Sequence, residues 1–340
     1  MTPSSAPRLS TREPARKTHP IARAKRLSHV TFERPDLDRT AVFLKDFGLE
    51  VVRRTNTELL LRGAHDHDSC YVVRRGPRPR FLGLGFEVGS LLEIQTLAAL
   101  PGATRIASVG RLENGVATRL RDPSGFEVEA LLATERKAPE PVEIAADGRT
   151  SRPNVLRLGQ VVIEVADFQA SSAWYTEHFG LIPSDVEVLP DGSPARAYFR
   201  LDQGATPTPS HALGIAQGFV PSLNRSAFVV RDADAIRARG VALTKRGWTH
   251  AWGMGRRIVG AHVCECWKDA YGDKHEHYCG GELVDATREP NVHPMAAESV
   301  APWTKVPSSR ISNARWSTRS WLRAWAWLRG NPKEYRHVFS

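Results

Sequence analysis

Three side chains that bind metals in many proteins alternate along one short segment: His262, Cys264 and Cys266. If this segment is a strand, the three point to the same side, and Glu276 of the next predicted strand can face them. Such a group could hold Zn(II) or Fe(II). The separation matches no common zinc motif, and free cysteines usually behave as small hydrophobic residues. We therefore favour two buried thiols that fill space over a metal site.

Two distant segments end in the same way. Residues 269–276 (Asp-Ala-Tyr-Gly-Asp-Lys-His-Glu) and 122–129 (Asp-Pro-Ser-Gly-Phe-Glu-Val-Glu) each read as a turn that leads into a strand carrying a carboxylate. The alternating segments 27–33 and 158–165 also match in pattern. These pairs indicate an internal duplication, in which each half of the chain repeats the same elements.

The elements that must position these residues follow a strand, helix and three-strand order, repeated four times. In the first half, Asp36 is the predicted N-cap of an amphipathic helix that stops at Gly48. We expect the other elements of that half at 27–33, 50–54, 58–62, 69–74, 81–88, 90–100 and in three strands ending near 131. In the second half we expect strands at 158–165 and 223–230, helices at 167–179 and 232–239, and further strands to 217 and to 278. This mixture predicts an α+β fold of four βαβββ units.

Composition and charge restrict the class of protein. The chain has 340 residues, 41% of them hydrophobic, and four cysteines, too few for a disulfide framework at this length. It has no apolar run long enough to span a membrane and no secretory leader pattern at its start, so we expect a cytoplasmic protein without integral membrane contact. The net charge of +10 lies in the termini: residues 1–26 carry seven Lys/Arg against one Glu, and residues 301–340 carry eight against one. The body between them is slightly acidic, which argues against a nucleic-acid surface.

We expect five segments along the chain. They are a disordered basic tail (1–26), an N-terminal domain (27–132), a Pro- and charge-rich linker (133–153), a C-terminal domain with the cavity (154–285) and a basic, Trp-rich extension (286–340). Within the extension, residues 316–328 have the pattern of a short amphipathic helix, whose tryptophans suit a protein interface and a homo-oligomer. In the first domain, His65 and His67 fall in a predicted turn, where solvated side chains are more common than a metal site.

The repeated units resemble the vicinal-oxygen-chelate superfamily of glyoxalase I, bleomycin-resistance proteins and type I extradiol catechol dioxygenases. The unit order, the spacing and the Asp-x-x-Gly-x-x-x-Glu ends carry the resemblance over residues 27–285, and four units in two tandem domains are most similar to the extradiol enzymes. The resemblance implies Fe(II) or Mn(II) in the C-terminal domain, held by two histidines and a carboxylate. The two histidine positions are Gln160 and Arg225 here, and the carboxylate position is Glu276.

Other positions of the resemblance are matched in part. An acid/base histidine falls at His211, the substrate-binding Gly-Arg-His signature reads Gly-Arg-Arg and ends at Arg257, and an active-site tyrosine is replaced by Cys266. The residues that we expect to contact substrate are Gln160, His262, Cys266, Trp248 and Trp252. The corresponding N-terminal positions are His29, Gly83 and Glu129, for which the resemblance implies a structural role.

Arg225 decides the expected chemistry. A guanidinium group has only donors and cannot bind a metal, so we expect Arg225 to pair with Glu276 in the place of the cation. Ordinary Fe(II) ring cleavage is then in doubt, and we favour no cofactor, while Fe(II), Mn(II) or Zn(II) at Gln160 and Glu276, or at the cysteine group, stays open. The sequence favours an enzyme that acts on a catechol-like or oxyanionic small molecule, with His211 as acid/base and Arg225 and Arg257 as oxyanion contacts. The alternatives are a non-catalytic small-molecule-binding protein of the bleomycin-resistance type, or a structural pseudoenzyme.

Overall fold

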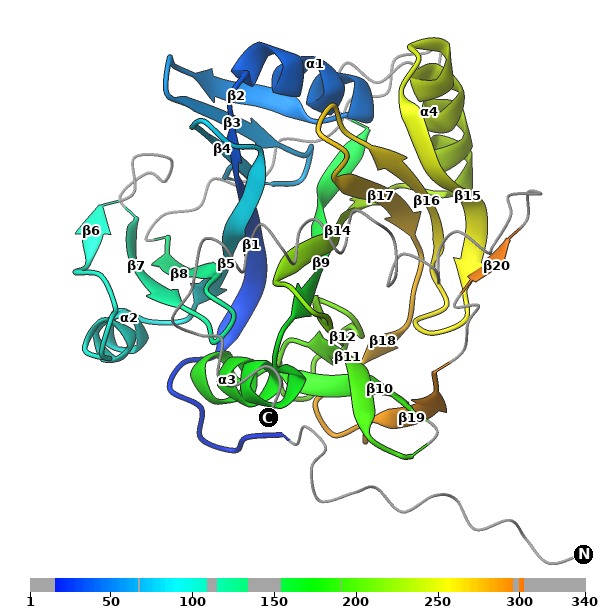
Figure 1. Ribbon diagram of the computed structural model, residues 1–340. Helices are drawn as coiled ribbons and strands as arrows, with labels where there is room; N and C mark the ends of the chain where they lie inside the picture. The colour runs from blue at the N-terminus through cyan, green and yellow to red at the C-terminus, as the bar shows by residue number, and fades with distance from the viewer. Residues whose placement is uncertain are drawn as a thin grey trace, which may run out of the picture.

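Two curled β-sheets lie side by side in the computed structural model of the chain, with four helices in the part described (Figure 1). The structure describes residues 16–66, 68–108, 115–133, 154–189, 191–295 and 300–302. The predicted linker, except Ala133, and the predicted Trp-rich helix at 316–328 therefore lie outside the described residues, as does His67. None of the described helices is long and apolar enough to cross a membrane.

The N-terminal sheet has eight strands in the order β2-β3-β4-β1-β5-β8-β7-β6. Its strands are β1 (Ala24–Arg34), β2 (Glu50–Arg54), β3 (Glu58–Arg62), β4 (Tyr71–Arg75), β5 (Arg80–Val88), β6 (Ala107–Ser108), β7 (Val116–Arg121) and β8 (Glu127–Leu132). Helices α1 (Leu37–Phe47) and α2 (Leu91–Ala98) accompany them. These elements agree with the predicted ones to within a few residues.

The C-terminal sheet has ten strands in the order β19-β10-β11-β13-β9-β14-β17-β16-β15-β20. Its strands are β9 (Val155–Val165), β10 (Ile182–Val188), β11 (Pro194–Arg200), β13 (Leu213–Gln217), β14 (Ser222–Val230), β15 (Thr249–Arg257), β16 (Val263–Lys268), β17 (Lys274–Cys279), β19 (Asn291–Pro294) and β20 (Val300–Pro302). A separate pair is formed by β12 (Thr208–Pro209) and β18 (Leu283–Val284), and the helices are α3 (Phe168–Phe179) and α4 (Ala233–Lys245). The α+β class and the tandem vicinal-oxygen-chelate arrangement are thus confirmed.

Local signals fix where the helices begin and end. The Asp36 carboxylate accepts from the backbone N–H groups of residues 38 and 39, and Gly48 ends α1 with φ 110°. Helix α4 runs six residues past its predicted end at Arg239, through Gly240. A side chain at Gly240 would lie 2.5 Å from the Glu265 carboxylate, so this glycine serves close packing rather than helix termination.

The duplication places matching residues in register. In the N-terminal sheet, the residues opposite one another on β1, β5 and β8 are His29, Gly85 and Glu129. In the C-terminal sheet, the corresponding row on β9, β14 and β17 is Gln160, Ala227 and Glu276. Two residues before the middle of each row stand Gly83 and Arg225, on the same face as the row. The sheets therefore bring the compared positions together as the resemblance implies.

The two halves share one hydrophobic core. Arg34 of β1 is fully buried and pairs with Asp269 at 3.0 Å and Asp273 at 2.7 Å, both in the turn before β17. His277 of β17 stacks on Phe47 of α1 with ring centroids 3.8 Å apart. Such contacts join the halves at their cores rather than only at their surfaces.

The first described residues correct one expectation. We expected the whole of 1–26 to be disordered, but residues 16–26 are ordered against the rest of the chain. Backbone N–H groups of Ile21 and Ala22 donate to carbonyls at the end of α3, and Arg16 and Arg23 bind Asp202. Ala22 is buried, so this short segment extends the packed body beyond what its basic composition suggested.

Candidate functional site

A fully buried carboxylate, Glu276 of β17, is the centre of the candidate site. Its Oε2 accepts from Arg257 Nη2 at 2.5 Å and lies 3.1 Å from Arg225 Nε. Its Oε1 lies 3.4 Å from His262 Nε2. These three partners come from the end of β15, from β14 and from the residue before β16, so the curled sheet makes them converge.

The charges in this cluster follow from burial and pairing. Burial raises the pKa of Glu276, but the charges of Arg257 and Arg225 lower it by more than burial raises it. The pKa therefore lies below its ordinary value, and the group is a carboxylate. Burial lowers the pKa of His262 to about 4, more than Glu276 can restore, so this ring is neutral near pH 7. Two guanidinium groups thus face one carboxylate, which leaves one positive charge in excess.

The apolar side of the cluster supports the guanidinium groups. The Arg257 guanidinium lies over the Trp252 ring at 4.5 Å, and Trp252 packs with Cys264 and Cys266 in a small buried group. Burial raises the pKa of Cys266 to about 12 and that of Cys264 well above its ordinary value, so both are thiols. This agrees with the preferred interpretation that these cysteines fill space.

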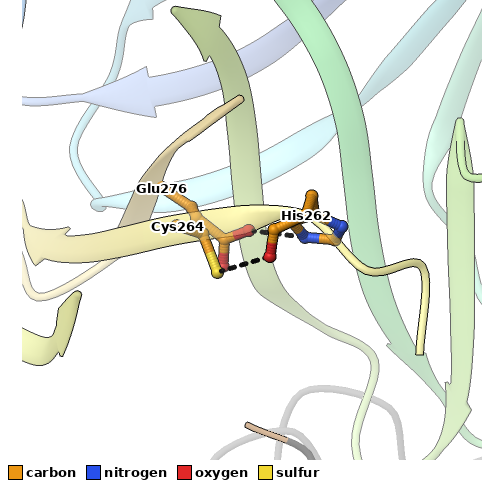
Figure 2. A group of neighbouring side chains, drawn as sticks. All are labelled: His262, Cys264 and Glu276. Atoms are coloured by element: carbon orange, nitrogen blue, oxygen red, sulfur yellow. Dashed lines mark hydrogen bonds and ion pairs between the residues drawn. The ribbon is translucent and has the colours of Figure 1, made fainter. Parts of the chain in front are cut away.

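A metal ion fits neither arrangement well. At the position implied by the resemblance, Arg225 offers no lone pair, and its charge and that of Arg257 already occupy Oε2 of Glu276. His262, Cys264 and Glu276 form the alternative group, with ligand atoms within 4.8 Å of one another (Figure 2). A cation there would lie beside the same two guanidinium groups, whose positive charge opposes its binding. Gln160 is buried in the same cross-strand row as Glu276, and its Nε2 has no hydrogen-bond partner among the described residues.

His211 stands beside this cluster, held by residues that the sequence did not point to. Its Nε2 lies 2.7 Å from Asp185 Oδ2, and its ring stacks on Tyr198 at 4.3 Å. The other oxygen of Asp185 binds Asn291 Nδ2 at 3.0 Å and His293 Nε2 at 2.9 Å, both on β19. Asp185 lies inside a strand, and nothing local in the sequence marks it. The pairing of β10 with β19 brings Asn291 and His293 to its second oxygen.

The ring charges near Asp185 can also be assigned. Burial raises the pKa of Asp185, but the hydrogen bonds that it accepts from His211, Asn291 and His293 lower the pKa below its ordinary value, so it is ionised. Burial lowers the pKa of His211, and Asp185 only partly opposes this, while the charges of Arg225 and Arg257 lower it further. His211 is therefore neutral. Its ring meets that of His262 edge-on, with centroids 6.3 Å apart.

A pocket with a volume of about 390 Å³ opens next to this pair. Its walls include Asp185, Asn291 and His293 on one side and residues 258–261 on the other. None of the site residues predicted from the sequence lines it. Two of its lining residues lie against the histidines: Asp185 binds His211, and a Cβ atom added at Gly260 would approach both His211 and His262.

Two residues considered in the sequence analysis, Trp248 and His65, lie apart from the cluster. Trp248 donates from its indole nitrogen to Asp46 at 2.9 Å and packs edge-on against Phe43 of α1, so it belongs to the joint between α1 and α4. The expectation that Trp248 contacts substrate receives no support from this placement. His65 lies exposed in a turn.

The N-terminal counterpart carries a related ion pair. Glu129 accepts from Arg119 Nε at 2.8 Å and lies 3.9 Å from His29 Nε2, across Gly85. A side chain at Gly85 would collide with the His29 ring, so the ring occupies the space over this glycine. This compact arrangement fits the structural role that we expected there.

Comparisons with known proteins find similar sequences. A profile of the Glyoxalase/Bleomycin resistance protein/Dioxygenase superfamily matches residues 157–272. The chain is 25% identical over 303 residues to Metapyrocatechase 2 of Cupriavidus necator, covering 84% of this chain and 91% of that protein. 

Solved structures show the same fold at lower identity. The Mn(II)-bound glyoxalase from Novosphingobium aromaticivorans superposes with a TM-score of 0.72 at 19% identity, over 85% of this chain and 94% of that one. Homoprotocatechuate 2,3-dioxygenase from Brevibacterium fuscum gives 0.72 at 18% identity, over 88% and 95%. Residues 157–272 are therefore similar to the Glyoxalase/Bleomycin resistance protein/Dioxygenase superfamily, and the chain shares its fold with a homoprotocatechuate 2,3-dioxygenase and a glyoxalase.

Proposed function

We propose that this chain is an extradiol-dioxygenase-like enzyme that acts on a small aromatic or oxyanionic molecule at the Glu276 cluster, without a metal held as in the usual triad. The observation that carries the proposal is the excess of guanidinium over carboxylate. Arg225 and Arg257 share Glu276, and two buried donor atoms, Arg225 Nη2 and Arg257 Nε, have no hydrogen-bond partner in the described part of the chain. An unpaired buried cation is costly, and an anionic ligand offsets that cost.

The roles of the residues follow from their chemistry. The guanidinium groups stabilise a phenolate or carboxylate oxygen of the ligand, since they are fixed, positively charged and partly unsatisfied. His211 is neutral and close to them, so it can take a proton from a hydroxyl group and return it. Gln160 offers an amide from β9, the strand next to β14, and the Trp252 ring packs against the face of the Arg257 guanidinium. We place Cys266 at the wall as a thiol that does not react.

Calorimetric titration with a matched set of small aromatic compounds tests the ligand class. Benzoate and 4-nitrocatechol carry or readily form an anionic oxygen, whereas benzylamine presents the same ring with a cation. We expect saturable binding of the first two and none of benzylamine. Binding should fall at least tenfold in Arg225→Gln and stay unchanged in Arg237→Gln, which removes an exposed arginine on α4. Equal affinity for benzoate and benzylamine would contradict the proposal.

A non-catalytic binding protein is the second candidate. The specific observation in its favour is that the two guanidinium groups at Glu276 can bind an anionic ligand, while the neighbouring Cys264 and Cys266 are protonated thiols and therefore poor nucleophiles. Incubation of the protein with a panel of catechols, with and without added Fe(II) or Mn(II), separates the two functions. Product formation or oxygen uptake lost in His211→Gln supports the enzyme; tight binding with no turnover under any of these conditions supports the binding protein.

A further inference from the structure

The Asp185–His211 pair has a defined orientation of hydrogens. An ionised carboxylate only accepts hydrogen bonds, so the nitrogen that faces it must carry the hydrogen. His211 Nε2 therefore donates to Asp185 Oδ2 across 2.7 Å. Because the ring is neutral, its other nitrogen, Nδ1, holds the lone pair. This assignment needs no ligand and follows from the partners of the ring.

The lone pair of His211 points to a place where a side chain is missing. Nδ1 is buried and has no hydrogen-bond partner among the described residues. A Cβ atom added at Gly260 would lie 2.7 Å from this nitrogen and 3.2 Å from His262 Nδ1. Gly260 (φ 81°) and Ala261 (φ 53°) form a turn in which the left-handed backbone brings the chain close to both rings. A non-glycine residue at 260 would cover the lone pair.

We propose that Asp185 positions His211 so that Nδ1 is its proton-accepting atom, and that Gly260 keeps a side chain out of the space beside this buried atom. The proposal deepens the function proposed above, because it names the atom that would take the proton of a ligand hydroxyl. In that step the O–H bond of the ligand breaks and an Nδ1–H bond forms. The resulting imidazolium is balanced by Asp185, and the ligand oxyanion by the guanidinium groups. Asp185 keeps its charge throughout and is a positioning residue.

The neighbours of Asp185 make its amide variant a sharp test. Asn291 Nδ2 donates to Asp185 Oδ1, and His293 Nε2 binds the same oxygen. In Asp185→Asn the single carbonyl oxygen should take that position, because two groups donate to it. The new amide nitrogen then faces His211 Nε2 and donates to it. The substitution should move the hydrogen of His211 from Nε2 to Nδ1 without changing the size of residue 185.

Nitrogen-15 NMR of histidine-labelled full-length protein reads this hydrogen directly, with the His211 signals identified by their loss in His211→Gln. We expect His211 to carry its hydrogen on Nε2 in the parent and on Nδ1 in Asp185→Asn. Glu187→Gln is the matched control, since it makes the same change on the same strand at a carboxylate bound to Arg196, and should leave His211 unchanged. A parent ring with its hydrogen on Nδ1, a doubly protonated ring, or an unchanged tautomer in Asp185→Asn would overturn the proposal.

The space that Gly260 leaves beside His211 is tested with 4-nitrocatechol, whose visible absorption reports its ionisation. Gly260→Ala is compared with Gly280→Ala, which imposes similar backbone strain (φ 69°) at a position where an added Cβ meets nothing within 4 Å. We expect the apparent affinity for the ionised probe to fall at least tenfold in Gly260→Ala and less than twofold in Gly280→Ala. Equal losses would refute the role of Gly260. If even the parent binds no probe, the proposed ligand class fails, whereas the NMR result still decides the role of Asp185.

Discussion

At the scale of single residues, the sharing of one carboxylate by two guanidinium groups determines how substitutions should behave. Glu276→Gln leaves Arg225 and Arg257 without a buried counter-charge, whereas Arg225→Met leaves a balanced pair of Arg257 and Glu276. Removing the counter-charge of a buried cation typically costs about 3–5 kcal/mol. We expect Glu276→Gln to approach that cost and Arg225→Met to remain clearly below it in urea unfolding. Equal destabilisation by the two variants would mean that Arg225 does not depend on Glu276.

The same residues should control metal binding. Arg225→His supplies a nitrogen ligand beside the oxygen ligands of Gln160 and Glu276, but Arg257 would still bind Oε2 of Glu276 at 2.5 Å. We therefore expect little Mn(II) or Fe(II) in Arg225→His and close to one equivalent in Arg225→His with Arg257→His, measured by elemental analysis after dialysis. Adding Glu276→Ala to the double variant should abolish the metal. Stoichiometric metal in the unchanged protein, lost in Glu276→Ala, would contradict the proposed metal-independent site.

At the scale of elements, the segment before β1 is a test of where order begins. Deleting residues 1–15 should leave the unfolding free energy unchanged, because their composition has no core-forming pattern. Deleting residues 1–23 also removes the backbone hydrogen bonds of Ile21 and Ala22 and both arginine partners of Asp202. At about 1 kcal/mol for each net hydrogen bond, we expect a loss of roughly 2 kcal/mol or more. Equal thermal stability of the two truncated proteins would show that residues 16–23 contribute nothing to folding.

At the scale of the whole molecule, a buried histidine makes the joint between the halves sensitive to acid. Burial lowers the pKa of His277 to about 3, and its Nε2 donates to the Phe47 carbonyl at 2.8 Å. The unfolded chain protonates this ring near pH 6.5. Between these values only the unfolded state binds the proton, so stability falls as the pH falls, with a slope of about 1.4 kcal/mol per pH unit from this residue.

His277→Gln should remove that slope, because an amide can still donate to Phe47 but does not titrate. Urea unfolding at several pH values between 4 and 6 measures the difference from the parent. His65→Gln, at an exposed position, is the control and should leave the pH dependence unchanged. A parent and His277→Gln with parallel pH profiles would show that His277 is protonated in the folded protein.

We also propose that the chain forms a homo-oligomer, which sedimentation of the purified protein tests.

Much of the architecture was predictable from the sequence, because it depends on local signals. Asp36 and Gly48 bound α1 through a cap and a left-handed residue, and alternation marked the strands on which Gln160 and Arg225 lie. The pairing of Arg225 with Glu276 was expected from the family resemblance, and the structure has it at 3.1 Å. These features are set by residues close in sequence or by a pattern that the chain uses twice.

Tertiary structure alone decided the rest, because it depends on which distant segments meet. Arg257 joins Arg225 on Glu276 only where β15 curls back, which turns a simple pair into a shared carboxylate with excess positive charge. Asp185 meets His211 on the β11 side, where Tyr198 lies opposite Asp185 and stacks on the His211 ring, while the pairing of β19 with β10 brings further donors to its second oxygen. The Gly-Arg-Arg segment marked Arg257 but not its pairing with Glu276, and nothing in its own segment marks Asp185, since a buried charge is tolerated only through partners that lie elsewhere in the chain.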